Sequence, residues 1–237
     1  MKTKDAYGLG LLAYQEGNHA AQFTVESDIA ETEVWDVATF FRPYDEMPEL
    51  ERRALSMCRG RVLDVGAGAG SHSLWLQDRG FDVEAVDLSH GAAEVMRRRG
   101  VGTVLEQDFF AVGGRRYDTL LMLMNGAGIV GTIDRLPMLF DKAGELLNEG
   151  GMILLDSSDL IYLYEDEDGS VAIDLNARYY GEIEYEMSFE GRTDEPFAWL
   201  FVDFDTLQAA AEDAGWDCRM VCADDHYQYL ACITRKR

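Results

Sequence analysis

Long apolar segments are missing from this chain. The longest, 120–124 and 152–155, have the length of strands and fall far short of the roughly 20 residues needed to span a bilayer. The first residues also lack the apolar run and the small-residue cleavage site of a signal peptide. We therefore expect a cytoplasmic protein that has no membrane partner.

Cysteines are few, and their spacing is not that of a metal site. Cys58, Cys218, Cys222 and Cys232 form no CxxC pair and have no histidine at a zinc-ligand spacing. We expect them to be reduced and buried, where a thiol acts as a small apolar side chain. The sequence predicts no bound metal.

Positive charge is also scarce. The chain has 21 Lys and Arg against 44 Asp and Glu, a formal net charge of −23, and only four of the basic residues are lysine. A phosphate backbone would repel such a chain, which argues against a nucleic-acid partner. An acidic surface that is poor in lysine fits a salty cytoplasm or a GC-rich genome equally well.

The chain does contain the material for a core. Hydrophobic residues make up 47% of its 237 residues, aromatic residues 11%, and only four residues are proline. This composition is typical of a globular protein and not of a disordered one. Because a single core can serve a chain of up to roughly 250–300 residues, we expect one α/β domain with added elements.

Short apolar runs alternate with helix-length periodic segments from Arg61 onward. Strands are predicted at 61–65, 82–86, 102–105, 117–124 and 152–156, and helices at 71–79, 89–99 and 133–147. Alternating strands and helices form βαβ units, hence a parallel sheet that is covered on both faces. All strands then end at one edge of the sheet, where α/β proteins bind ligands.

The C-terminal third of the sequence predicts further strands and one further helix. The alternating pattern of 179–189 can pair with 197–204, which indicates an inserted β-hairpin over about 178–204. A helix at 206–214 and a closely connected antiparallel pair, 217–223 with 227–234, are expected to follow.

The first 55 residues show no strand–helix alternation. We interpret 1–55 as a mainly helical lead-in that packs over the ligand edge, and 56–237 as the α/β domain.

A glycine-rich turn follows the first strand of the parallel sheet. Glycines at 66, 68 and 70 let the backbone turn sharply and let a ligand approach closely. The dinucleotide fingerprint G-x-G-x-x-G does not fit, because Ser71 stands where its third glycine or alanine would be. A P-loop is excluded too, since no Gly-Lys-Ser/Thr follows.

Carboxylates stand at the ends of the next two strands. Asp87 ends the second strand about 20 residues after the glycines, a position from which a carboxylate binds ribose hydroxyls. Gln107, Asp108 and Phe109 follow the third strand, where an acid can accept an adenine amino group and apolar neighbours can hold the ring. Three such features at successive strand ends indicate a nucleoside ligand.

These segments resemble a known family. VLDVGAGAG, VEAVDLS, EQDFF, YDTLLMLMNGAG and LLNEGGMILLDSS, between Arg61 and Ser158, are similar to the class I S-adenosylmethionine-dependent methyltransferases. The resemblance implies a Rossmann-like, doubly wound sheet of seven strands, mostly parallel, with an antiparallel last strand at 227–234. It implies S-adenosylmethionine as cofactor and S-adenosylhomocysteine as product.

The resemblance also assigns roles to single residues. Asp64 and the turn (Gly66, Ala67, Gly68 and Gly70) would hold the methionine end of the cofactor. Asp87 would bind the ribose, Leu88 would pack on the adenine, and Gln107, Asp108 and Phe109 would recognise the adenine edge.

The acceptor site is expected after the fourth strand. Asn125 begins the segment Asn-Gly-Ala-Gly there, next to the cofactor sulfonium, and is a candidate cofactor-binding and catalytic residue. The segment is neither the proline-rich tetrapeptide of nucleic-acid amino methyltransferases nor the Pro-Cys pair of cytosine C5 enzymes. Its sequence therefore favours a small-molecule acceptor.

Other side chains are candidates for the acceptor site. His226, before the last strand, is a candidate general base, and His72 lies beside the turn. Arg42 is a candidate partner for a carboxylate of cofactor or substrate. Aromatic residues of the lead-in and of the hairpin could wall the pocket or simply pack against the core; they are Tyr7, Tyr14, Phe40, Phe41, Tyr44, Tyr179, Tyr180, Phe197 and Trp199.

Four functions therefore remain open: a small-molecule methyltransferase, a nicotinamide dehydrogenase, a methyltransferase for protein or RNA, and a cofactor-binding regulatory protein without catalysis. The small-molecule methyltransferase fits the motifs best. The methylated atom (N, O, C or S), the oligomeric state and the general base are not readable from the sequence.

Overall fold

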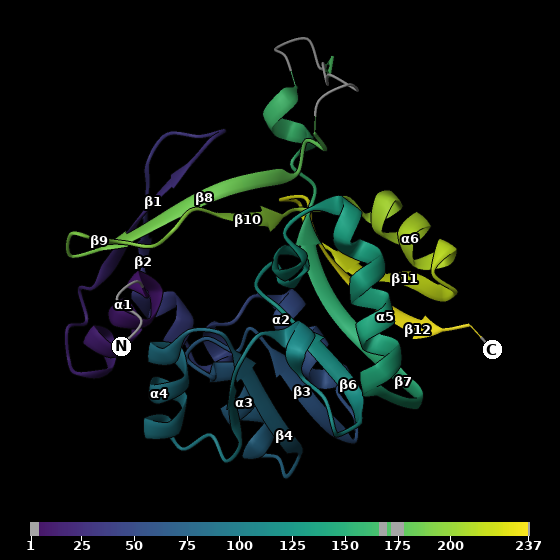
Figure 1. Cartoon of the computed structure of the whole chain (residues 1–237), viewed down its shortest axis with the longest axis horizontal. Coiled ribbons are helices and arrows are strands. Elements are labelled where there is room, and N and C mark those ends of the chain that lie inside the picture. Colours follow the sequence, from purple (N-terminus) through teal and green to yellow (C-terminus); the bar gives the residue numbers. More distant parts are fainter. Residues whose placement is uncertain (1–4, 166–169, 172–177, 237) are drawn as a thin grey trace.

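The computed structural model describes residues 5–165, 170–171 and 178–236 (Figure 1). At its centre is a seven-stranded sheet with the strand order β11-β12-β7-β6-β3-β4-β5. Its strands are β3 (Arg61–Val65), β4 (Asp82–Asp87), β5 (Val104–Glu106), β6 (Tyr117–Met122), β7 (Leu147–Ser158), β11 (Trp216–Ala223) and β12 (Gln228–Arg235).

The strand directions of this main sheet confirm the predicted topology. The strands β3 to β7 pair in parallel, whereas β12 is antiparallel to both of its neighbours, β7 and β11. The sheet is therefore mostly parallel with an antiparallel last strand. The parallel strands all end at the same edge.

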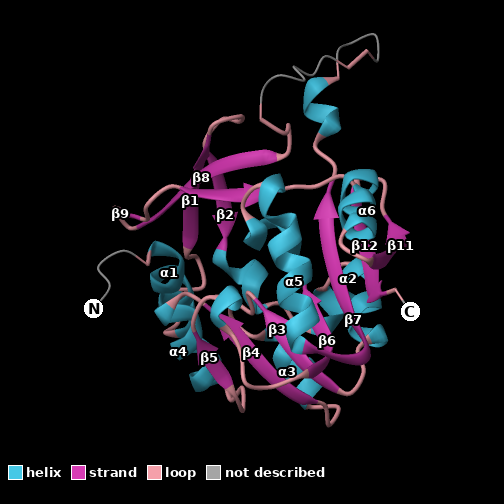
Figure 2. Cartoon of the chain, turned by 45° about the vertical axis from the view of Figure 1, so that its right-hand side comes forward, coloured by secondary structure: helices cyan, strands magenta, loops and turns pink. Residues whose placement is uncertain are grey.

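Helices cover both faces of the main sheet (Figure 2). On one face lie α2 (Glu49–Met57), α3 (Ser71–Gln77) and α4 (His90–Arg99); on the other lie α5 (Leu136–Leu146) and α6 (Phe204–Asp213). Successive residues of β3 show why both faces are apolar: Val62 packs in a cluster with Leu55 of α2, and Leu63 packs in a cluster with Leu139 of α5.

Pairing between strands sets the length of β7. The prediction placed this strand at 152–156, but it starts at Leu147 and continues to Ser158, which lies opposite Gln228 of β12. The long helix predicted at 133–147 begins as a 3₁₀ turn and becomes α5 at Leu136, with Pro137 in its first turn.

A second sheet lies beside the first, in the upper left of Figure 1. Its strands run in the order β10-β8-β1-β2, and β9 (Arg192–Thr193) pairs with β8 at one end. They are β1 (Gln22–Ser27), β2 (Glu33–Asp36), β8 (Glu182–Phe189) and β10 (Phe197–Leu200). The antiparallel pairing of β8 with β10 confirms the predicted hairpin.

The lead-in contributes two strands that the sequence analysis did not predict. It contains α1 (Ala6–Gln15), 3₁₀ turns at 37–41 and 44–46, and the start of α2, but also β1 and β2. The strand β1 pairs with β8, so that lead-in and hairpin form one sheet. Alternation in β1 buries Phe23 and Val25, yet the pattern is too short to stand out in the sequence. The domain boundary at residue 55 stays a prediction.

Within the described residues, no helix is both long enough and apolar enough to cross a membrane. The same part of the chain holds no group of three or more His, Cys, Asp and Glu side chains placed to bind a metal ion. All four cysteines are free thiols; Cys58, Cys218 and Cys232 are buried, and Cys222 is half-buried.

Candidate functional site

A cavity of about 1250 Å³ lies where the parallel strands of the main sheet end. Its floor is formed by residues at the ends of β3, β4, β5, β6 and β7, and the second sheet contributes the opposite wall. The predicted site residues that line it are Asp64, Gly66, Ala67, Gly68, Asp87, Leu88, Gln107, Asp108, Phe109 and Asn125. One predicted residue of the turn, Gly70, is not part of this lining.

The glycine turn requires glycine for two different reasons. Gly66, Gly68 and Gly70 have φ values of 68°, 55° and 80°, in the left-handed region that favours glycine. A Cβ at Gly70 would lie 2.9 Å from a methyl group of Val101 and 3.0 Å from the Met96 side chain. Gly70 therefore lets the turn pack against α4, whereas Gly66 and Gly68 face the cavity.

Asp87 is held by two backbone amides at the end of β4. Its Oδ1 accepts a hydrogen bond from Ser89 N at 2.8 Å, and its Oδ2 accepts one from Gly68 N at 2.9 Å. Burial is the main cause that raises the pKa of Asp87 to about 6. The negative charges of Asp5 and Asp64 raise it further, whereas the hydrogen bonds from the two amides lower it. Each carboxylate oxygen keeps a lone pair for a ligand.

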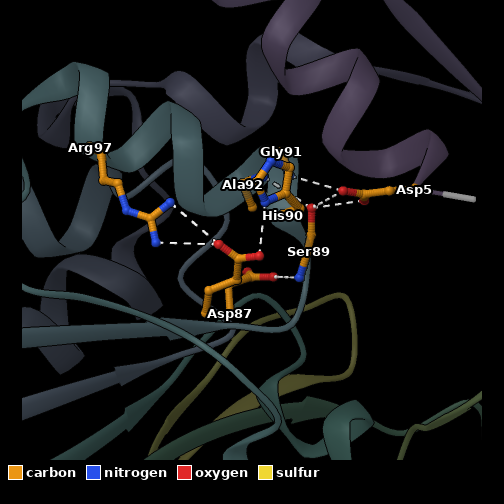
Figure 3. Close-up of polar contacts among 8 residues, drawn as sticks. Asp5, Asp87, Ser89, His90, Gly91, Ala92 and Arg97 are labelled. Carbon is orange, nitrogen blue, oxygen red and sulfur yellow. Dashed lines mark hydrogen bonds and ion pairs between the residues drawn. The ribbon is translucent and has the colours of Figure 1, made fainter. Parts of the chain in front are cut away.

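Asp5 joins the starts of two helices next to Asp87 (Figure 3). Its carboxylate accepts hydrogen bonds from Gly8 N in α1 and Gly91 N in α4, both at 2.9 Å, and from Ser89 Oγ at 2.8 Å. The two helices come so close that a Cβ at Gly91 would overlap the backbone of Gly8. The acid thus satisfies amides of both helix N-termini, which otherwise lack partners.

Tyr7 approaches the glycine turn from the lead-in. The backbone amides of Ala6 and Tyr7 donate to Asp194, between β9 and β10, at 2.7 and 3.3 Å. The phenol oxygen of Tyr7 lies 2.6 Å from where a Cβ on Gly68 would be. Burial raises the pKa of Tyr7 well above its ordinary value, so the phenol is neutral and a hydrogen-bond donor. From the sequence, Tyr7 is only a candidate aromatic residue of the pocket wall.

Apolar surface lies beside Asp87. Leu88 is 61% exposed although it lines the cavity, and Phe109 is buried. The Asp108 carboxylate accepts Phe110 N at 2.8 Å and so caps the 3₁₀ turn after β5. An exposed leucine at the rim of a cavity offers a flat ligand an apolar face.

The loop after β6 is fixed by carboxylate and amide side chains. Met124 and Asn125 have positive φ values of 63° and 58°. Asp156, at the end of β7, accepts Gly126 N at 2.8 Å and Met124 N at 3.1 Å. Burial raises the pKa of Asp156 to about 6. The Asn125 amide donates to Leu200 O at 3.2 Å, which connects the loop to β10.

A buried ion-pair chain lines the inner wall. Glu51 of α2 binds His72 Nε2 at 2.8 Å through one oxygen and Arg42 through the other. Burial lowers the pKa of His72, but Glu51 and Asp64 outweigh it and hold this pKa above its ordinary value. Arg42 and His72 are separate candidates in the sequence and Glu51 is not among them, because no local pattern pairs these three residues.

His226 lies elsewhere. It is exposed in the turn between β11 and β12, and it is not one of the residues that line the cavity. Gln228, two residues later, does line it. The short turn directs the histidine to solvent, so the described structure offers no geometric support for a general base at His226.

Acidic side chains outnumber basic ones in the cavity wall. Among the described residues, nine carboxylates and two arginines line it. The acids are Asp5, Asp36, Glu51, Asp64, Asp87, Asp108, Asp156, Asp194 and Glu195. Arg42 is paired with Glu51, and the guanidinium of Arg135 lies 5.3 Å from the ring centroid of Phe110.

A family model described as a methyltransferase domain matches residues 36–221, well over half of the chain. The chain belongs to the class I S-adenosylmethionine-dependent methyltransferases. In this methyltransferase the cavity lies at the carboxyl edge of the parallel strands, where α/β folds bind their ligands.

Solved structures agree with this assignment. A methyltransferase from Bacteroides fragilis, solved in complex with S-adenosylhomocysteine, is 41% identical, with a TM-score of 0.94 over 100% of this chain and 97% of that one. An amino pentose methyltransferase from Micromonospora echinaspora, solved with S-adenosylmethionine, is 20% identical, with a TM-score of 0.57 over 81% of this chain and 91% of that one. The second likeness shows the fold alone.

A curated relative matches a shorter part of the methyltransferase. The Bacillus subtilis protein YqeM is 24% identical over 129 residues. The match spans 52% of this chain and 52% of YqeM, about half the length of each.

Proposed function

We propose that this methyltransferase binds S-adenosylmethionine in the cavity and transfers its methyl group to a small-molecule acceptor. One observation carries the cofactor half: the glycine turn, the Asp87 carboxylate and the apolar Leu88 come together at one sheet edge. This is the combination that a nucleoside with a charged tail requires. A cytoplasmic location stays a prediction.

The residues present fit the nucleoside end of the cofactor. Asp87 is anchored by two amides and keeps one lone pair on each oxygen, which suits two ribose hydroxyls. Leu88 and Phe109 offer apolar contact to the adenine, and Gln107 and Asp108 offer polar groups at its edge.

The residues also fit the methionine end. The Nε of Arg42 is buried and has no hydrogen-bond partner among the described residues, although the guanidinium is paired with Glu51. The Tyr7 phenol lies close to Gly68 of the glycine turn. Both donors suit the methionine carboxylate, and the negative Asp64 suits its ammonium group.

When bound, the cofactor supplies a methyl group that its sulfonium has already activated. The protein's part is to align the acceptor with that methyl group and to exclude water. Asn125 and Asp156 fix the loop after β6, and the second sheet closes the opposite wall. An enclosed wall favours a small acceptor, and the acidic lining repels a nucleic-acid backbone.

Calorimetry with the purified chain tests the cofactor. We expect S-adenosylhomocysteine to bind with one-to-one stoichiometry and NAD to give no heat of binding. If NAD binds and S-adenosylhomocysteine does not, the cofactor proposal is wrong.

Turnover separates catalysis from regulation. Labelled S-adenosylmethionine is incubated with the chain and a pool of small metabolites, a protein extract or RNA. We expect label only in the small metabolites. Label in protein or RNA would favour the alternative acceptors, and cofactor binding with no transfer to any pool would favour a regulatory protein.

A further inference from the structure

The second sheet presents connected aromatic rings to the cavity. Ring centroids lie 5.9 Å apart between Trp35 and Tyr185, 6.2 Å between Tyr185 and Phe197, and 6.1 Å between Phe197 and Trp199. All four side chains line the cavity and are half-buried. They come from β2, β8 and β10, so this wall faces the strand ends across the cavity.

Gly128 shows how closely this wall approaches the loop after β6. A Cβ at Gly128 would overlap the indole of Trp199. The Asn125 amide of the same loop donates to Leu200 O, next to that tryptophan. The aromatic wall is therefore packed against the segment where we expect the acceptor.

The charge of the cavity is unbalanced. Its described lining has nine carboxylates and two arginines; Arg42 is paired with Glu51, and the guanidinium of Arg135 lies 5.3 Å from the ring centroid of Phe110. A cofactor that carries one sulfonium leaves most of this excess uncompensated. Burial is the main cause that raises the pKa of Asp87 and of Asp156. Neighbouring acids add to the rise, Asp5 and Asp64 at Asp87 and Glu51 at Asp156, whereas backbone amides lower both pKa values.

Such a site attracts cations and repels anions. A negative potential concentrates positively charged ligands in a cleft, and aromatic faces attract an organic cation. An acceptor with a carboxylate or phosphate would meet repulsion from the nine carboxylates of the described wall.

We propose that the acceptor is a small primary or secondary organic amine, protonated in solution and methylated on nitrogen. This inference rests on the proposed function. The ammonium group first loses its proton to water. The nitrogen lone pair then forms the new C–N bond while the S–C bond breaks and its electrons return to sulfur. The sulfonium becomes a neutral thioether and its positive charge passes to the nitrogen, so the methylated product is already an ammonium. The one proton given to water before the attack is therefore the net proton released.

Charge fractionation of a metabolite pool tests the acceptor class. Cationic, neutral and anionic fractions are each incubated with labelled S-adenosylmethionine and the full chain. We expect label in the cationic fraction, together with proton release. We also expect acetylation of that fraction in water, which blocks amines and spares hydroxyls, to abolish labelling.

Two other results would overturn the proposal that the acceptor is an amine. These are label confined to the neutral or anionic fraction, and label that survives acetylation. No label in any fraction, while S-adenosylhomocysteine still binds, would contradict the small-molecule function itself and this inference with it. Loss of S-adenosylhomocysteine binding would instead contradict the cofactor proposal.

Variants of Trp199 test the aromatic wall, with tetramethylammonium chloride as the probe. We expect this cation to inhibit labelling of the cationic fraction more than sodium chloride does at the same concentration. In Trp199→Leu its inhibitory concentration should rise about five- to tenfold, whereas Trp199→Phe should retain the parent value because it keeps a ring. Equal inhibition of the parent by both salts would contradict a cation site.

The controls separate recognition from folding. In both Trp199 variants the dissociation constant for S-adenosylhomocysteine should stay within about twofold, because the indole is assigned to the acceptor wall. Trp75→Leu is the matched control, since Trp75 stacks on Tyr44 and is not among the residues that line the cavity. If Trp199→Leu and Trp199→Phe behave alike, the wall does not act through its aromatic rings.

Discussion

At Asp87, two backbone amides approach one carboxylate, one from the glycine turn and one from the start of α4. The arrangement aligns the oxygens for two further donors. Burial makes the ionised form of this carboxylate less favourable and raises its pKa to about 6. A ligand that supplies hydroxyl donors stabilises the ionised carboxylate, because its hydroxyl groups donate hydrogen bonds to the charged form.

Replacing this carboxylate should weaken cofactor binding. We expect Asp87→Ala to cost about 1.5–3 kcal/mol in S-adenosylhomocysteine affinity, measured by calorimetry, which is the usual scale for charge-assisted hydrogen bonds. Asp82→Ala is the control, because Asp82 begins the same strand but is exposed and pairs with Arg61. Unchanged affinity in Asp87→Ala would remove Asp87 from the ribose role.

The same group predicts a pH dependence of binding. Above pH 6 Asp87 is ionised, and below it the carboxyl holds a proton that must leave before both oxygens accept hydroxyls. The dissociation constant for S-adenosylhomocysteine should therefore rise about tenfold between roughly pH 7.5 and pH 5. Asp87→Asn should bind more weakly with a flat profile over this range. A profile that stays steep in this variant would assign the titration to another group.

The helix α1 shows what an element adds to the site. Asp5 ties its start to α4, and Asp194 ties it to the second sheet. Tyr7 lies between these two anchors, so its phenol is held over Gly68. The helix α1 thus links the glycine turn to the second sheet, which carries the aromatic wall.

Loss of one anchor should loosen this helix. We expect Asp194→Ala to lower the free energy of unfolding by about 1 kcal/mol, since Ala6 N and Tyr7 N lose their acceptor. Amide hydrogen exchange in α1 should speed up, and S-adenosylhomocysteine should bind more weakly. Asp141→Ala, at an exposed position on α5, is the control. Unaltered exchange in α1 would show that Asp194 does not hold it.

For the whole molecule, the formal net charge of −23 works against compactness. Like charges on the surface repel one another, and salt largely screens this repulsion between charges more than about 8–10 Å apart at physiological ionic strength. The nine carboxylates around one cavity add to this repulsion, although they also prepare the cavity for cationic ligands.

Salt should therefore stabilise the protein. We expect the unfolding temperature to rise by about 2–8 °C between roughly 0.05 and 0.5 M sodium chloride, followed by circular dichroism. Potassium chloride should give the same rise, because screening depends on ionic strength. A fall in the unfolding temperature would mean that ion pairs, such as Arg98 with Glu94 and Glu16, contribute more than the repulsion.

Much of the cofactor half of the site was readable from the sequence. Period-two and helical patterns are local, and alternation of strands with helices forces a parallel sheet whose strands end at one edge. That topology alone places the glycine turn, Asp87 and Asp108 together, and the structure agrees. The individual cofactor contacts stay predictions.

The parts of the site outside the strand-end motifs were decided by tertiary structure. Three contacts join residues far apart in the sequence: the pairing of β1 with β8, the hydrogen bond from Tyr7 N to Asp194, and the Glu51–His72 pair. No local pattern encodes them, because they depend on how surfaces pack once the elements exist. The sequence by itself thus determined the parallel sheet and its ligand edge. Only packing decided which wall closes over that edge, and that His226 lies outside it.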